Sequence, residues 1–270
     1  MAASDKSSAS SFRWWEFYAV RYGMGTVVGA VVFFFLCFTN PALKPLLFGA
    51  DTWKIDGTQL ALFGAYGLAF CYIASAPVLV FHAGRFLLQP KLDGHSASFR
   101  LVVGLCPPLV LASIAADHSG GADLAAKVFY AAAAFVFSLI VWLQLIVVVY
   151  SLWKSGDLYD FYVRLDKRRL RAEGSIVESY RHLREHGNSF FIVFLEILLA
   201  LVLFAAGNYE FVATGKEMPR ATYVVPYVII LLVWTFPAVL VWLIGTVIER
   251  RFCDSEPCRI RLDRSKPRSN

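Results

Sequence analysis

Residues 128–153 read VFYAAAAFVFSLIVWLQLIVVVYSLW, and residues 189–207 read SFFIVFLEILLALVLFAAG. As helices, both runs are long enough to cross a hydrocarbon core about 30 Å thick. Between them lies the charged segment 154–188, which is rich in Lys, Arg, Asp and Glu. This order predicts two membrane-spanning helices joined by a segment long enough to fold outside the lipid.

Four more apolar runs extend this pattern to the whole chain. The six predicted spans lie at about residues 23–39, 59–81, 99–116, 128–153, 189–207 and 223–248. None of the runs has the period-two alternation of a transmembrane strand. We therefore expect an all-α, polytopic transmembrane helical bundle as one membrane domain over 23–248. A leader with an interfacial segment is expected at 1–22, and a basic tail at 249–270.

Composition favours lipid as the surroundings of this chain. Hydrophobic residues make up 58% of the sequence and charged residues 17%, whereas soluble domains carry roughly 25% charged residues. The net charge of +6 comes from loops between apolar runs, where basic residues set membrane orientation. We therefore expect the lipid bilayer as a partner and no nucleic acid.

The distribution of Lys and Arg predicts the orientation. If alternate loops are assigned to opposite sides, 21 of the 26 Lys and Arg residues fall on the side of the two termini and of segment 154–188. Cytoplasmic loops carry the excess of positive charge in membrane proteins. We expect both termini and the connector in the cytoplasm, and a plasma membrane of the bacterial inner-membrane type.

The connector 154–188 has the pattern of two amphipathic helices. The first is expected over 157–172, and the second begins at Ser175, where Ser175 and Glu178 form a capping box. Gly187 and Asn188 are expected to separate it from the fifth span. A basic cluster in the first helix predicts binding of anionic lipid or of a protein partner; its members are Lys167, Arg168, Arg169 and Arg171. The connector is therefore either a coupling element or a passive segment on the membrane surface.

The second connector helix also contains a weak metal-binding pattern. His182, Glu185 and His186 match H-x-x-E-H, which on a helix places two His four residues apart with a Glu beside them. An ordinary charged helix with ion pairs between successive turns explains the same residues. We favour that explanation and expect no metal and no cofactor.

Two polar residues interrupt the apolar runs that flank the connector. Glu196 and Gln144 lie about 12 Å and about 13 Å from the connector end of their spans, at 1.5 Å per residue. An ionisable group at that depth normally faces the interior of the bundle or a water path. The pair is therefore either an intramembrane transport site or a hydrogen bond between Glu196 and Gln144 that holds two helices together.

Backbone patterns add two further expectations. Pro107 and Pro108 fall in the middle of the third span and predict a bent or broken helix there, which would widen a path through the bundle. Gly25 and Gly29 form a G-x-x-x-G pattern, for which packing within the chain is favoured over a dimer contact. A homo-oligomer remains one of the possible assemblies.

These observations predict a channel, pore or transport-like protein with a polar intramembrane site. The alternative is a scaffold or signalling component that acts through its connector. A more distant alternative is a membrane-embedded metal-dependent enzyme, and enzymatic activity is not favoured.

Overall fold

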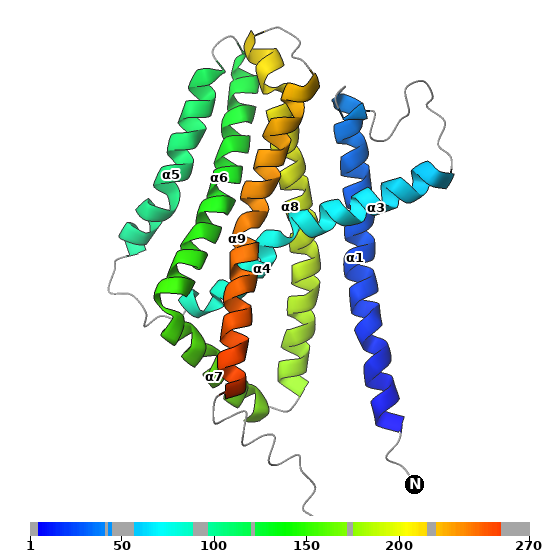
Figure 1. The fold of residues 1–270 in the computed structure, drawn as a ribbon, viewed down its shortest axis with the longest axis vertical. Coiled ribbons are helices and arrows are strands. Elements are labelled where there is room, and N and C mark those ends of the chain that lie inside the picture. The colour runs from blue at the N-terminus through cyan, green and yellow to red at the C-terminus, as the bar shows by residue number, and fades with distance from the viewer. Residues whose placement is uncertain are drawn as a thin grey trace, which may run out of the picture.

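The computed structural model describes the backbone of residues 5–40, 43–44, 57–88, 97–119, 122–171, 175–214 and 220–254, and side chains at 22–40, 43–44, 57–87, 102–119, 122–165, 187–208 and 224–251. Every regular element in this part of the chain is helical (Figure 1). The helices are α1 (Asp5–Thr39), α3 (Gly57–Ala74), α4 (Ala76–Ala83), η1 (Gly84–Leu88), α5 (Ala97–His118), α6 (Leu124–Trp153), α7 (Ser155–Arg171), α8 (Ser175–Thr214) and α9 (Arg220–Asp254).

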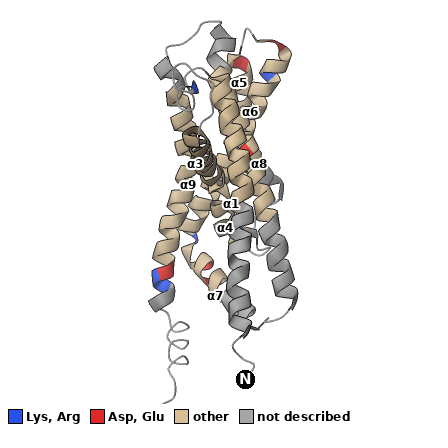
Figure 2. Ribbon diagram, turned by 90° about the vertical axis from the view of Figure 1, so that its right-hand side faces the viewer, with Lys and Arg blue, Asp and Glu red and all other residues tan. Residues whose placement is uncertain are grey.

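Five segments are long and apolar enough to cross a membrane. They are Tyr22–Thr39, Gly57–Leu87, Leu124–Trp153, Gly187–Asn208 and Val224–Arg251. The predicted third span lies in α5, whose described apolar portion, Val102–His118, is shorter than the others. Charged residues are found mainly near the two ends of the bundle (Figure 2). The chain is an all-helical membrane protein by composition, and the sixth crossing remains a prediction.

The long helices run side by side, and one segment crosses them. Helices α6, α8 and α9 follow the long axis, α5 packs on α6, and α3 crosses α1 steeply (Figure 1). The first residues of α1 and the last residues of α9 lie at the same end of the bundle as α7 (Figure 1). This arrangement is compatible with the expected topology, while the side of the membrane on which that end lies remains a prediction.

The crossing of α1 and α3 depends on glycine. A Cβ atom on Gly67 would meet the backbone of α1 at the oxygen of Thr26 and, at 2.7 Å, at the nitrogen of Ala30. A Cβ atom on Gly29 would meet the backbone of Gly67, with the carbonyl carbon 3.1 Å away. Small residues allow such close approach of helix backbones in membranes. The G-x-x-x-G pattern is therefore used for packing within the chain, as we favoured.

The proline pair was expected to bend or break α5; the helix is not broken there, and the bend stays a prediction. The helix continues through Pro107 and Pro108 from Ala97 to His118. Proline at 107 removes the N–H that would bond the carbonyl oxygen of Val103. The indole Nε1 of Trp142 on α6 donates to that oxygen at 2.9 Å. A donor from the neighbouring helix thus replaces one of the two N–H groups that the proline pair removes at membrane depth.

The second predicted span is divided instead, at Ser75. The backbone N–H of Val78 bonds the oxygen of Ser75 rather than that of Ala74, because the chain tightens before the α4 helix that carries Pro77 in its first turn. The indole of Trp234 on α9 donates to the freed Ala74 oxygen at 3.4 Å. The sequence analysis did not predict the division of this span. As in α5, the indole of a tryptophan on another helix bonds the carbonyl oxygen that lost its helical partner.

The connector agrees with expectation at its start and differs at its end. Helix α7 covers nearly the expected range, and α8 begins at Ser175 as predicted. However, α8 continues without interruption through Gly187 and Asn188 into the membrane. One glycine inside a helix costs about 1 kcal/mol, less than leaving backbone groups unbonded near lipid. Similarly, α1 begins at Asp5, so most of the expected leader is part of a long helix.

Replacing Gly67 with Ala should separate α1 from α3, because its Cβ would overlap the α1 backbone. We expect a loss of about 1–3 kcal/mol in unfolding free energy, measured by detergent-induced unfolding of the purified protein. Gly64→Ala on the same helix is the matched control, since its Cβ would meet no atom within 4 Å. Equal stability of the two variants would contradict this account of the crossing.

Trp142→Phe should leave the Val103 oxygen without its indole donor while keeping most of the aromatic contact. We expect the free energy of unfolding to fall by about 0.6–2 kcal/mol, the range for hydrogen bonds between membrane helices. Thermal unfolding in detergent provides the measurement. Trp153→Phe, at a side chain 82% exposed, should have a smaller effect, and the reverse order would disprove the role given to Trp142.

Candidate intramembrane site

Glu196 occupies the centre of the described bundle. It lies on α8, one position after the buried Leu195, and its side chain is 0% exposed. The carboxyl group is directed toward α1 and α3: a Cβ atom on Gly25 would lie 3.1 Å from Glu196 Oε1 and would also collide with Cys71 Sγ. The absence of a side chain at Gly25 therefore makes the space that this carboxyl group and thiol occupy.

The carboxyl group has no hydrogen-bond partner among the described residues, at either oxygen. The thiol of Cys71 lies beside it, but a thiol is only a weak donor. The surrounding core cluster is apolar and includes Phe70, Leu195 and Leu199. An ionised carboxylate without a partner is very costly in such surroundings. The site is therefore suited to a carboxyl group that is neutralised by a proton or by a bound cation.

Gln144 is equally buried but is not bonded to Glu196. Its Nε2 atom donates to the carbonyl oxygen of Trp234 at 3.5 Å, and its Oε1 atom has no partner among the described residues. The carboxyl oxygens of Glu196 are likewise unpartnered. The direct bond that would have held these two helices together is therefore not formed.

Trp234 relates the two polar residues to each other. Its carbonyl oxygen accepts from Gln144, and its indole donates to Ala74, one turn beyond Cys71 on α3. Cys71 in turn lies beside Glu196. Polar atoms from α6, α9, α3 and α8 thus follow one another through an otherwise apolar core. We call Gln144, Trp234, Cys71 and Glu196 the polar track.

The other predicted sites lie where side chains are not described. Lys167, Arg168, Arg169 and Arg171 belong to the last turns of α7, and the possible metal ligands His182, Glu185 and His186 lie in the first half of α8. Among the described side chains, no group of three or more His, Cys, Asp or Glu could hold a metal ion. The lipid-binding and metal-binding hypotheses both stay untested.

Comparisons with known proteins give no further guidance. No family model, curated protein or solved structure matches this chain. The function has to be argued from the polar track itself.

Sequence reasoning found Glu196 and Gln144 but missed the residues between them. The sequence analysis assigned no role to Cys71 and used Gly25 only as part of a packing pattern. Trp142 and Trp234 fall in the middle of their spans, whereas most membrane Trp residues lie near the interfaces. That unusual depth was the signal that could have identified both as donors within the bundle.

Glu196→Met should stabilise the folded protein, because it removes two unpartnered buried oxygens and keeps the side-chain volume. We expect a gain of about 1–3 kcal/mol in the free energy of unfolding, measured in lipid-free detergent. Glu249→Met, at an exposed position, should change stability by less. A loss of stability at position 196 would indicate that the carboxyl group is a structural partner after all.

Proposed function

We propose that this protein is a proton-linked transporter of the membrane in which it lies, with Glu196 as the group that takes up and releases the proton. The observation that carries this proposal is a fully buried carboxyl group with no hydrogen-bond partner among the described residues. Ionisable groups are expensive inside a membrane, and those that persist there often lie on ion or proton pathways.

A proton suits this site better than a metal cation. One carboxyl oxygen is enough to bind a proton, whereas hard cations require several oxygen ligands around them. Gln144 Oε1 supplies one more free acceptor in the core, and the polar track connects its surroundings to those of Glu196. In this proposal Glu196 carries the exchangeable proton. Gln144 and Cys71 are the polar side chains that lie along the path of the proton.

The orientation completes the proposal. We place six spans in a plasma membrane, with α5 as the third, both termini in the cytoplasm, and α7 on the cytoplasmic surface. The excess of Lys and Arg in segment 154–188 and in the two termini supports this placement. The position of α7 at the same end as the outer ends of α1 and α9 is compatible with it (Figure 1).

Reconstitution into liposomes tests the function directly. Purified protein should acidify or alkalinise a dye-loaded vesicle interior when a potassium potential is imposed with valinomycin. Glu196→Gln should reduce the initial rate at least about tenfold, because the amide neither takes up nor releases a proton at neutral pH. Asp117→Asn, at an exposed acid, should leave the rate unchanged.

The outcome also separates the alternatives. Vesicles that stay tight to protons with wild-type protein, or a Glu196→Gln variant with the full rate, would overturn the transport proposal. A scaffold acting through its connector would then be the better explanation. That alternative predicts loss of partner binding when Arg168 and Arg169 are replaced, with membrane insertion intact.

A further inference from the structure

A second site lies at the α7 end of the bundle and shares no residue with the polar track. It is a cavity of about 400 Å³ between α4, α6, α7 and α9, within the range of about 300–1,000 Å³ that is common for ligand sites. Its inner wall consists of Leu158, Val241 and Ile248, which are all buried. Leu158 packs with Ile248 and Phe86, so α7 closes the cavity at this end.

The cavity opens sideways, away from the bundle. Five lining residues are themselves exposed: Leu79, Trp242, Gly245, Thr246 and Glu249. Glu249 lies two residues before the end of the Val224–Arg251 span, whereas Trp242, which is 63% exposed, lies about 10 Å further into the span at 1.5 Å per residue. In a membrane the mouth therefore faces lipid, with Glu249 at the level of the headgroups and Trp242 beside the acyl chains.

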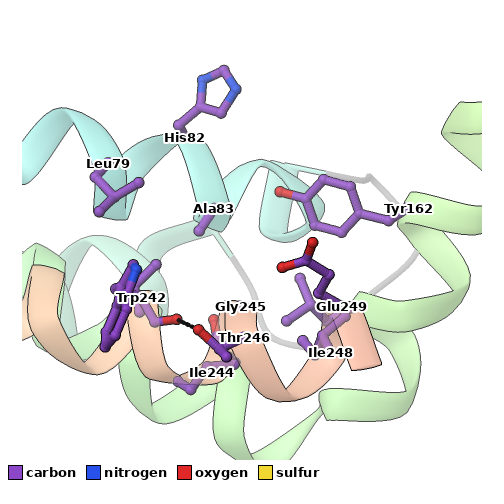
Figure 3. A pocket seen from close by; sticks show the side chains of 13 residues that line it. Leu79, His82, Ala83, Tyr162, Trp242, Ile244, Gly245, Thr246, Ile248 and Glu249 are labelled. Carbon is purple, nitrogen blue, oxygen red and sulfur yellow. Dashed lines mark hydrogen bonds between the residues drawn. The ribbon is translucent and has the colours of Figure 1, made fainter. Parts of the chain in front are cut away.

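The lining of the cavity includes an acid, Glu249, and a phenol, Tyr162. The Glu249 carboxylate lies next to the Tyr162 ring, and the Tyr162 hydroxyl is directed past it toward the side of Ala83 (Figure 3). Neither group makes a hydrogen bond or an ion pair with a described residue. The other two hydroxyl groups are already used: Thr246 donates to the oxygen of Trp242 at 3.0 Å, and Ser151 donates to the oxygen of Val147 at 2.7 Å.

His82 also lines the cavity, with its ring directed away from the Glu249 carboxylate (Figure 3). The guanidinium group of Arg85, which is outside the cavity lining, lies 2.8 Å from His82 Nε2, and Arg85 Nε donates to the His82 carbonyl oxygen at 2.9 Å. The Glu249 carboxylate is therefore the acid that the apolar cavity presents to a ligand.

We propose that this cavity binds one phospholipid whose headgroup carries a primary ammonium, as phosphatidylethanolamine does. An acyl chain fills the apolar space, and the ammonium donates to Glu249 and Tyr162. A choline headgroup has no N–H to donate to these two acceptors. An anionic glycerol headgroup places no positive charge at the carboxylate. The acid at the mouth thus selects the zwitterionic lipid with a donor.

Native mass spectrometry of the full-length protein in detergent measures this selectivity. Dioleoyl phosphatidylethanolamine, phosphatidylcholine and phosphatidylglycerol are titrated separately, so that only the headgroup differs. We expect the ethanolamine lipid to bind roughly fivefold more tightly than either of the others, since an exposed ion pair contributes up to about 1 kcal/mol. Equal affinity, or a preference for the anionic lipid, would overturn the proposal.

Two pairs of variants assign that preference to this cavity. Glu249→Gln should reduce ethanolamine-lipid binding to the choline level, whereas Asp160→Asn removes the same charge from α7, outside the cavity lining, and should not. Gly245→Phe should fill the cavity and abolish the tight binding, since no atom lies within 4 Å of an added Cβ. Gly64→Phe, at an equally open position on α3, is its control. Retained preference in Glu249→Gln or Gly245→Phe would refute the site.

Discussion

A backbone group without a hydrogen-bond partner is expensive at membrane depth, because lipid cannot replace the hydrogen bonds that water would make. Such groups arise in α5, where Pro107 lacks an N–H, and at the junction of α3 and α4, where the N–H of Val78 bonds Ser75 instead of Ala74. In both places the carbonyl oxygen is bonded by an indole from another helix, Trp142 for Val103 and Trp234 for Ala74. The same contacts that repair the backbone therefore determine which helices lie together, and the bundle is held by polar as well as apolar packing.

The Glu196 site contrasts with those repaired positions. The structure satisfies freed carbonyl groups across long sequence separations, yet the described part of the chain offers no partner to the oxygens of Glu196 or to the Oε1 atom of Gln144. Unsatisfied groups in a core that is otherwise well satisfied are expected at functional positions, where activity rather than stability decides the residue. Gly25 adds to this contrast, because its missing side chain leaves room around the carboxyl group.

Sequence reasoning was strongest where hydrophobic length decides the outcome. The apolar runs gave five helices of spanning length, and the capping box at Ser175 gave the start of α8. It failed where a distant side chain decides, because no local pattern tells that Trp142 will replace the proline N–H in α5. Local propensity was also misleading at two other places. It gave no sign of the division at Ser75, where contacts with another helix matter, and it predicted an end at Gly187, where the helix continues. The cavity beneath α7 required four helices to be placed before it could be recognised.

The uninterrupted course of α8 has a mechanical consequence. A single helix of 40 residues is a stiff rod about 60 Å long at 1.5 Å per residue, and it carries Glu196 on the same shaft as the charged residues after Ser175. A rotation of the outer end of α8, caused by the membrane surface or by another molecule, would therefore also rotate the Glu196 carboxyl group relative to Cys71. Binding at the surface and protonation in the core would then be coupled through the rotation of one helix.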